Sequence, residues 1–546
     1  MLEETEIQFG DFLINDERVS YNDPRGQQET IHVCSRLVLT AITRNSDGND
    51  WGKLFTLTDP AGVEKQYHMR NAANSAVAIV DLKHKGLMMS AHTRAHALLA
   101  QYLTSVRTER QMFSSAKLGW VADTSFVLPD GSFGTPEVVY SGGYRDYGFG
   151  TAGNWKEHVG KYCSGNSRLI FAASTAFAAP LLAAVDMEGG GFHYVGKSSR
   201  GKSTCLEVAA SVYGSAAHYL QSWDTTKNSL EQLAEAHNDC LMVIDELGSV
   251  DGAIVGPTLY MIANGHGKSR MHQPKRRWRV LFLTSGEITL AEHMEDAGKT
   301  TKIGQEVRLL NITPPPGAVG TDLLDQSWFE KTHSLGGPAE FADNLKAATR
   351  KHYDTPLTQW LSILAKSRAT VGSDCRTHIE AFTKRVLPPN ATGEVSRAIR
   401  RFAIVAAAGE IATAHKLTGW KVGEATAAAE KCFTAWMQYR RTFDPVAKAV
   451  DRVRQFILDN ENRIEVVGGD ALTEKVGYKK KGSYLIFPEV FRDEVCAGTK
   501  PDDIARCLEN AGYLNTSGKN RLTKQERIGG ELAYYYSVSD KILEAA

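Results

Sequence analysis

The sequence predicts an α/β fold built around a phosphate-binding loop, and three segments of the chain support this prediction. Residues 196–203 read Gly-Lys-Ser-Ser-Arg-Gly-Lys-Ser, which matches the pattern G-x-x-x-x-G-K-[ST]. Residues 241–246 are a short apolar run that ends in two carboxylates, and residues 280–285 are a second apolar run that ends in two hydroxyls. Short apolar runs of this kind are typical of parallel strands that are buried on both faces.

The glycine-containing octet has the flanks that a phosphate loop requires. Residues 192–195 before it predict a strand, and residues 204–213 after it carry apolar side chains at helical spacing. In this arrangement the loop N–H groups and the helix N-terminus converge on phosphate oxygens. We expect ATP to bind Gly196, Lys197, Ser198, Ser199, Arg200, Gly201, Lys202, Ser203 and Thr204. Lys202 should reach the β- and γ-phosphates, and the Ser203 hydroxyl should bind Mg²⁺.

The two carboxylates that end the apolar run 241–246 predict the second half of the site. Acidic side chains at the C-terminal end of a parallel strand lie in the crevice where α/β sheets bind ligands. Asp245 should hold Mg²⁺, and Glu246 should orient and deprotonate the attacking water. A surface acidic pair or helix cap is the alternative, but the following Leu247-Gly248 leads into a glycine-rich loop. The presence of both carboxylates favours hydrolysis over nucleotide sensing alone.

The strand predicted over residues 280–283 leads to a hydroxyl that can contact the γ-phosphate or the attacking water. We favour Ser285 for this role, with Thr284 as the alternative, since hydroxyls are also common in turns.

The segment between the two apolar runs is strongly basic. It contains six cations over residues 264–279, and no acidic residue occurs between Asp251 and Glu287. Glycines at its start and Gln273-Pro274 at its middle predict a projecting hairpin. A hairpin of one charge sign is suited to a phosphodiester backbone, so we expect DNA contacts from Lys268, Arg270, Lys275, Arg276 and Arg277. The alternative is a solvated loop whose arginines serve a neighbouring subunit's nucleotide.

Composition excludes several other classes of protein. The 546 residues carry 63 basic and 63 acidic side chains, so DNA contacts have to be local. The eight cysteines are scattered without a C-x-x-C pair, which argues against zinc ribbons and redox motifs. An acidic start and the lack of a long apolar span predict a cytoplasmic protein without signal peptide or membrane contact.

Changes of pattern predict four regions. They are a β-rich N-terminal domain over residues 1–150, the nucleotide-binding core over 151–330, an alanine-rich helical region over 331–443 and a C-terminal module over 444–546. The helical region resembles the lid of AAA+ ATPases, which often brings an arginine to the nucleotide. Arg397, Arg400 and Arg401 are the arginines that this resemblance suggests, and exposed helix arginines without such a role are the alternative.

The C-terminal module has the pattern of a winged-helix domain. Three helices are predicted over residues 447–459, 488–495 and 501–511, and two strands over 521–523 and 533–538. Its basic side chains suit a DNA backbone, although winged helices also bind proteins. These side chains are Lys479, Lys480, Lys481, Lys519, Arg521, Lys524 and Arg527.

Short motifs along nearly the whole chain resemble the domain-of-unknown-function 927 family of phages and mobile elements. They include Cys34-Ser35-Arg36-Leu37, Asp50-Trp51-Gly52, Gly165-Asn166-Ser167-Arg168-Leu169, Gly189-Gly190-Gly191-Phe192-His193, the phosphate loop, residues 241–248, 263–268, 284–287, 304–309, 487–492 and Leu522-Thr523. Some members resemble MCM-like self-loading replicative helicases, which are AAA+ hexamers. The resemblance implies that residues 264–279 project into a central DNA channel, that Ser285 is the sensor, and that Arg308 is an arginine finger for an adjacent subunit.

The combined prediction is an ATP-dependent DNA helicase or translocase of a phage or mobile genetic element. It would act in DNA replication as a ring-shaped homo-hexamer on single-stranded or forked DNA, with ATP and Mg²⁺ as cofactors. No primase signature is recognisable in the sequence, so a primase or single-strand-binding protein is an expected partner. The alternatives are an AAA+ ATPase that remodels a protein or nucleoprotein, and an initiator that uses ATP as an assembly switch.

Overall fold

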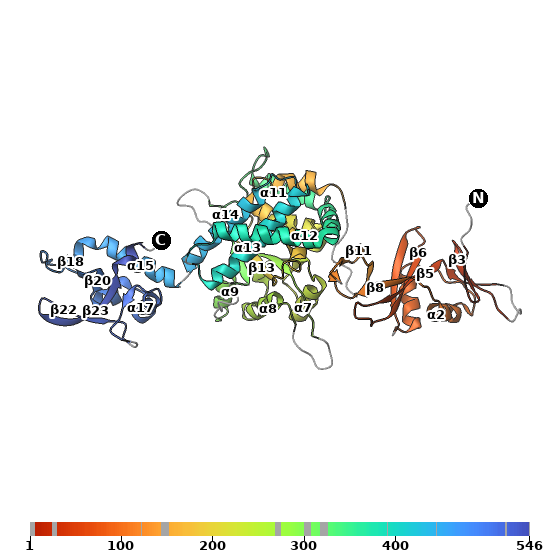
Figure 1. The fold of residues 1–546 in the computed structure, drawn as a ribbon, viewed down its shortest axis with the longest axis horizontal. Coiled ribbons are helices and arrows are strands. Elements are labelled where there is room, and N and C mark those ends of the chain that lie inside the picture. Colours follow the sequence, from red (N-terminus) through yellow and green to blue (C-terminus); the bar gives the residue numbers. More distant parts are fainter. Residues whose placement is uncertain are drawn as a thin grey trace. The chain divides into compact units, whose positions relative to one another are not determined.

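The computed structural model describes residues 6–24, 30–71, 73–121, 123–142, 152–267, 275–299, 307–316, 326–389, 391–443, 445–518 and 521–544. The chain divides into two compact units, Met1–Phe433 and Thr434–Ala546 (Figure 1).

The first unit begins with two β-sheets. One has the antiparallel order β1 (Ile7–Phe9), β2 (Phe12–Ile14), β3 (Arg18–Tyr21), β4 (Ile31–Ser35). The other has the order β12 (Val138–Tyr140), β8 (Gln111–Ser115), β5 (Leu37–Arg44), β6 (Gly52–Thr58), β7 (Glu64–Arg70). Helices α1 (Ser75–His84) and α2 (Ala95–Ser105) contribute to the same apolar core. The predicted strand-rich character of this region is confirmed.

A small antiparallel sheet joins this region to the rest of the unit. It consists of β9 (Gly119–Val121), β10 (Ser125–Leu128) and β11 (Gly131–Gly134). The Trp120 backbone N–H donates to Asp239 Oδ2 at 3.1 Å, and its indole N–H donates to the Pro180 carbonyl at 2.8 Å. Both hydrogen bonds attach this sheet to residues of the region 151–330.

The centre of the unit is a five-stranded parallel sheet. Its order is β14 (Gln221–Ser222), β15 (Leu241–Asp245), β16 (Leu281–Gly286), β13 (Gly190–Val195), β17 (Leu309–Ile312). The strands predicted before the loop, before the carboxylates and before the hydroxyls are therefore present. Since every pairing is parallel, the C-terminal ends of these strands lie at one edge of the sheet.

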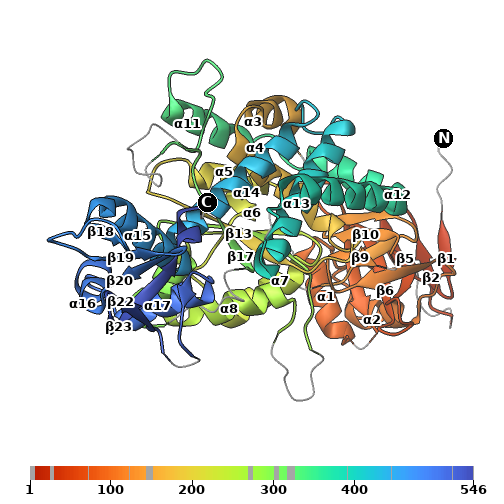
Figure 2. The same cartoon turned by 60° about the vertical axis from the view of Figure 1, so that its left-hand side comes forward.

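Helices cover both faces of the parallel sheet. Helices α7 (Lys227–Ala236), α8 (Gly252–Asn264) and α9 (Leu290–Asp296) lie on one face (Figures 1 and 2). Helices α4 (Ser167–Ala178), α5 (Lys202–Ser211) and α13 (Gly393–Ala414) lie on the other. Every residue of β13 is buried, as a strand covered on two faces requires.

The predicted helical region is confirmed by four helices. They are α11 (Pro338–Thr349), α12 (Thr355–Val386), α13 and α14 (Glu424–Phe443). Phe402 of α13 packs against Phe171 of α4 and Phe192 of β13, with ring centroids 5.5 and 5.3 Å apart. This aromatic cluster attaches the helical region to the parallel sheet.

Replacing Phe402 with alanine should destabilise the first unit by about 3–5 kcal/mol, because it removes a fully buried ring and leaves a cavity. The measurement is the midpoint of thermal unfolding. Val422→Ala is the control, since Val422 is 83% exposed and should leave the midpoint nearly unchanged. An equal midpoint for both variants would contradict the packing role of Phe402.

The second unit combines a mixed sheet with helices. The sheet has the order β18 (Ile464–Val466), β19 (Gly477–Lys480), β20 (Ser483–Ile486), β23 (Glu531–Ser539), β21 (Leu514–Asn515), and β22 (Lys524–Ile528) pairs with β23. Helices α15 (Pro445–Asp459) and α17 (Pro501–Asn510) confirm two predicted helices. In place of the third, predicted over 488–495, the structure has a short α16 (Pro488–Val490) followed by a π-helix (Phe491–Val495).

The prediction of a strand at residues 521–523 is wrong, because the hairpin strand begins only at Lys524. Its register is set by the turn at Gly529 and Gly530, both of which have positive φ. This turn pairs Ile528 with Glu531 and Lys524 with Tyr535. Strands β18, β19 and β20 were not predicted from the sequence.

Candidate nucleotide site

A glycine in a left-handed conformation shapes the loop between β13 and α5. Gly201 ends the loop at φ 114°, and a Cβ there would lie 2.6 Å from the Phe329 ring. Only glycine combines this backbone conformation with so close an approach. The backbone N–H of Gly196 donates to the Gly286 carbonyl at 3.2 Å, which links the loop to the neighbouring strand.

Lys202 is folded onto the loop. Its ammonium group donates to the carbonyls of Gly196 at 2.6 Å and Lys197 at 2.8 Å, and the residue is only 6% exposed. Burial lowers its pKa, and the nearby carboxylates of Glu287, Glu246 and Asp245 oppose this shift. Lys202 is therefore a buried cation with three carboxylates nearby.

Asp245 and Glu246 lie at the C-terminal end of β15, as predicted. Asp245 Oδ1 accepts hydrogen bonds from the Ser285 hydroxyl and, at 3.0 Å, from the Glu246 backbone N–H. Glu246 has left-handed backbone angles (φ 62°, ψ 71°) and an exposed side chain. Such a conformation is uncommon for a residue other than glycine, and backbone strain of this kind is concentrated at functional sites.

The two hydroxyls at the end of β16 have different partners. Ser285 donates to Asp245, whereas Thr284 Oγ1 accepts from the Trp223 indole N–H at 2.8 Å. Successive side chains of a strand point to opposite faces, so only one of these hydroxyls can face the acidic pair. The preference for Ser285 over Thr284 agrees with this arrangement.

Three features beside the loop were missed by sequence reasoning. His193 is fully buried in β13, its Nε2 lies 2.9 Å from the Ile288 carbonyl, and burial lowers its pKa to about 4. It is therefore neutral at pH 7. Glu287 contributes the third carboxylate near Lys202. Both residues lie in short motifs that carry the family resemblance, at 189–193 and 284–287, but no site role was assigned to them from the sequence.

The third feature is a strap over the phosphate loop. The Trp328 backbone N–H donates to the Arg200 carbonyl at 3.1 Å, and its ring stacks on Tyr194 of β13 with centroids 5.1 Å apart. Asn166 Oδ1 accepts from the backbone N–H groups of Glu330 and Lys331, both at 2.8 Å. These hydrogen bonds hold the strap against the start of α4.

Arg308 lies at the opposite edge of the sheet from the loop of its own chain. It precedes β17, and its carbonyl accepts from the Gly191 N–H at the start of β13, whereas the loop follows the end of β13. A six-residue strand spans about 17–20 Å. The structure therefore does not bring Arg308 together with Lys202 and the acidic pair of the same chain.

The prediction that Arg401 reaches the nucleotide does not hold for the loop of its own chain. Arg401 is buried at the N-terminal edge of the sheet, where its guanidinium donates to the Val307 carbonyl and lies against Gly190. Burial and the neighbouring charges of Arg308 and Arg397 lower its pKa to about 10. Arg397 and Arg400 are exposed on α13.

The two ends of the basic segment pair with each other, as the two strands of a hairpin do. His266 and Arg277 form an antiparallel bridge, and the Gly267 N–H donates to the Arg276 carbonyl at 3.1 Å. Arg276 pairs with Glu235 at 3.4 Å, while Lys275 and Arg277 are exposed. The predicted DNA contacts Lys268 and Arg270 lie outside the described residues.

The residues at the loop fit a nucleotide with Mg²⁺. In the described part of the chain, no group of three or more His, Cys, Asp or Glu is placed to hold a metal by itself. Mg²⁺ is usually bound by one or two protein oxygens together with substrate phosphates and water. Ser203 and Asp245 are the protein oxygens that this arrangement would use.

Comparison with known families supports the resemblance found in the sequence. A family model described as "Domain of unknown function (DUF927)" matches residues 16–275. This stretch contains the loop and the acidic strand, and the family resemblance is confirmed over it. No curated protein sequence matches the chain.

One solved structure, titled "SCCmec type IV Cch - active helicase", is similar along the whole chain. It is 17% identical, with a TM-score of 0.63, and the match covers 98% of this chain and 99% of that one. The similarity shows that the two share a mixed α/β fold. Two structures titled as the apo C-terminal region of NrS-1 are 8% and 9% identical, cover 67% and 72% of this chain and 86% and 91% of theirs, and have TM-scores of 0.25 and 0.24. Those scores are too low to carry an argument.

Within the described residues, no helix is long and apolar enough to cross a membrane.

Proposed function

We propose that this protein is an ATP-dependent DNA helicase or translocase of a phage or mobile genetic element. The observation that carries the proposal is the meeting of Lys202, Asp245, Glu246 and Ser285 beside the loop at one edge of a parallel sheet. A whole-chain fold similarity to a structure titled as an active helicase supports it. In this proposal residues 151–330 are a P-loop AAA+ core, residues 331–443 its lid, and the protein works as a hexameric ring.

Each residue at the loop has a distinct role in hydrolysis. Lys202 exchanges its hydrogen bonds with loop carbonyls for β- and γ-phosphate oxygens, and the loop N–H groups bind the same phosphates. Mg²⁺, held by Ser203 and Asp245, would neutralise phosphate charge. Ser285 orients Asp245 by hydrogen bonding, and Glu246 accepts the proton of the attacking water.

The rate of ATP hydrolysis should fall on the acidic side because Glu246 works only when deprotonated. Partial desolvation of its carboxyl group and the charge of Asp245 raise its pKa above the ordinary value of 4.5. It therefore takes up its proton at a higher pH than an ordinary glutamate, and the rate should be regained as pH rises through this raised pKa. The measurement is kcat between pH 4.5 and 8. The residual rate of Glu246→Gln should lack this acidic limb, and an identical limb in both proteins would contradict the assignment.

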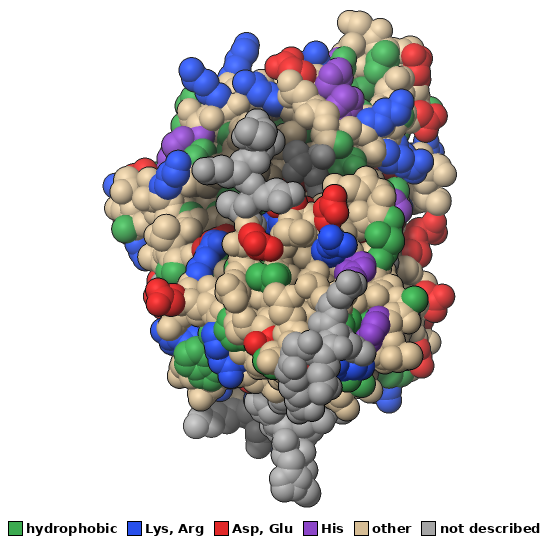
Figure 3. Space-filling view, turned by 90° about the vertical axis from the view of Figure 1, so that its right-hand side faces the viewer, with side chains coloured by type: hydrophobic (Ala, Val, Ile, Leu, Met, Phe, Trp, Pro, Cys, Tyr) green, Lys and Arg blue, Asp and Glu red, His purple; other side chains and the backbone are tan. Residues whose placement is uncertain are grey.

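Local basic groups serve DNA binding in this proposal. Basic and acidic side chains are intermixed on the face of the molecule shown in Figure 3, in line with the zero formal net charge. A charged hairpin at residues 264–279 would therefore supply the main backbone contacts, projecting into the ring channel.

Replacing Lys275, Arg276 and Arg277 together with alanine should weaken binding of single-stranded DNA. Each lost phosphate contact should reduce the slope of log K against log salt by about 0.7. The measurement is a titration of labelled oligonucleotide at several salt concentrations. A triple variant of Lys366, Lys384 and Arg385 on α12 removes the same charge elsewhere and should bind as the parent does. Equal binding by both variants would refute the hairpin assignment.

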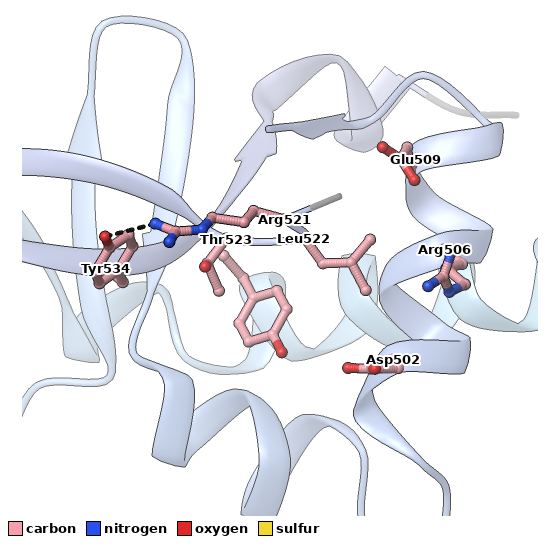
Figure 4. A pocket seen from close by; sticks show the side chains of 8 residues that line it. Asp502, Arg506, Glu509, Arg521, Leu522, Thr523 and Tyr534 are labelled. Carbon is pink, nitrogen blue, oxygen red and sulfur yellow. Dashed lines mark hydrogen bonds between the residues drawn. The ribbon is translucent and has the colours of Figure 1, made fainter. Parts of the chain in front are cut away.

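The second unit would act as a winged-helix domain. It contains an open cavity of about 420 Å³ between α17 and the segment leading into the β22–β23 hairpin (Figure 4). Arg506 and Arg521 line it, but so do Asp502 and Glu509. Arg521 donates to the Tyr534 hydroxyl at 2.8 Å. This mixture of charges suits a protein surface as well as DNA, so the unit is also a candidate binding site for a replication partner.

The decisive experiment is unwinding of forked duplexes carrying 5′ or 3′ tails, with and without ATP. The proposal requires ATP-dependent strand separation and an ATPase rate that single-stranded DNA stimulates. An ATPase that ignores single-stranded DNA would indicate a protein remodeller. Nucleotide binding without steady-state turnover would indicate an assembly switch.

A further inference from the structure

The C-terminal end of α8 holds the side chain of Arg308. Arg308 Nε donates to Asn264 Oδ1 at 2.9 Å, and its guanidinium carbon lies 4.6 Å from the centroid of the Tyr260 ring. Tyr260 and Asn264 are four residues apart, so they lie on the same face of the helix. A hydrogen bond and a cation–π contact from one helix face thus fix the position of this guanidinium.

The surroundings of Arg308 make such positioning necessary. Arg401 is close enough to Arg308 and to Arg397 to interact with each of them as a like charge, and Glu188 is an acidic group near Arg401. Like charges at short range repel each other. The hydrogen bond from Arg308 to Asn264 and its contact with the Tyr260 ring oppose this repulsion. The same excess of positive charge favours an anion such as a phosphate group.

The same end of α8 also carries the basic hairpin. Gly265 ends the helix at φ 73°, and a Cβ there would lie 2.4 Å from the Trp278 carbonyl oxygen. The Trp278 backbone N–H donates to the Gly265 carbonyl at 2.8 Å, and its indole N–H donates to the Ile262 carbonyl at 2.8 Å. The base of the hairpin is therefore attached to the residue that follows Asn264.

We propose that Tyr260 and Asn264 are positioning residues for Arg308, and that the C-terminal end of α8 couples the DNA-binding hairpin to the ATP site of the adjacent subunit. This inference rests on the proposed role of Arg308 in an adjacent subunit's site. Movement of the hairpin on DNA would move Asn264, and Asn264 would move the guanidinium. Hydrolysis in one subunit and DNA contact by its neighbour are then linked through one helix end.

The first test is steady-state ATP hydrolysis by single variants. Asn264→Ala and Tyr260→Ala should each lower kcat about 10- to 100-fold at unchanged KM, the range expected when a catalytic group is misplaced by about 1 Å. Asn264→Asp keeps an oxygen acceptor, and Tyr260→Phe keeps the ring face, so both should retain kcat within about two-fold. Parent-like rates for both alanine variants would overturn the inference.

The second test mixes variants within one assembly. Lys202→Ala has a defective loop and an intact Arg308, whereas Asn264→Ala has an intact loop and a misplaced Arg308. An equimolar mixture should hydrolyse ATP faster than either variant alone, because some interfaces combine the two intact halves. With Asn264→Ala folded, as judged by circular dichroism, the absence of such a gain would overturn the inference.

A mixture of Arg308→Ala with Lys202→Ala separates this inference from the proposed function. If ATP hydrolysis recovers in the mixture with Arg308→Ala but not in the mixture with Asn264→Ala, the site shared between subunits is supported and the positioning role of Asn264 is refuted. Absence of recovery of ATP hydrolysis with Arg308→Ala would refute the shared site itself.

The coupling between hairpin and ATP site is measured separately, as the stimulation of ATP hydrolysis by single-stranded DNA. Asn264→Ala should lose most of this stimulation, whereas Asn264→Asp should keep it. Full stimulation in Asn264→Ala would refute the coupling.

Discussion

Replacing Lys202 with alanine should reduce ATP hydrolysis to background. Lys202 is the only cation that the described structure places on the loop carbonyls of Gly196 and Lys197 while facing Asp245 and Glu246. Without Lys202, the negative charge that develops on the transferring phosphoryl group loses the positive group that would stabilise it. Phosphate release under saturating ATP measures the loss.

The control for this variant is Lys366→Ala. Lys366 is an exposed lysine of α12, and its removal should leave the rate unchanged. Lys202→Met separates charge from chain length, since it keeps most of the side-chain volume. A Lys202→Met protein that hydrolyses ATP at the parent rate would refute the assignment of the loop.

Replacing Arg308 with alanine should lower the rate by about 10³- to 10⁵-fold, the effect that arginine fingers have in GTPases. Its position at the N-terminal edge of the sheet means that this loss cannot arise in the loop of its own chain. Nucleotide binding and assembly should survive, because the loop and most of the surface are unchanged. Labelled-nucleotide binding and sedimentation measure these two properties beside the rate.

Arg376→Ala is the matched control, since Arg376 is an exposed arginine of α12 that donates to the Ala184 carbonyl. It should hydrolyse ATP as the parent does. A normal rate in Arg308→Ala would remove the arginine finger from the proposal. Loss of nucleotide binding in Arg308→Ala would instead assign this residue a structural role.

The position of Arg401 also bears on how these arginines work. It shares its edge of the sheet with Arg308, and its hydrogen bond to Val307 holds the chain just before β17. Arg401 therefore helps to place Arg308. The resemblance of this region to an AAA+ lid suggested instead that Arg401 contacts the nucleotide directly. Arg397, one helical turn earlier on α13, adds positive charge to the same edge.

The sequence by itself determined those features that depend on neighbours along the chain. The loop at residues 196–203, the buried strands before it and before Asp245, and the helix beginning at Lys202 are each specified by a local pattern of glycine, apolar and acidic residues. These patterns were sufficient to predict the loop, the acidic pair and Ser285, whose side chains the structure brings together.

Only the tertiary structure decided which side chains share an edge of the sheet. Strand order and parallel pairing bring Ser285 to Asp245, send Thr284 to Trp223, and separate Arg308 and Arg401 from the loop of their own chain. The hydrogen bond between Trp328 and Arg200 joins residues that are 128 positions apart. The hydrogen bond between Arg308 and Asn264 joins residues that are 44 positions apart. No local periodicity encodes such pairs, because they arise from packing between elements that the chain connects only through long loops.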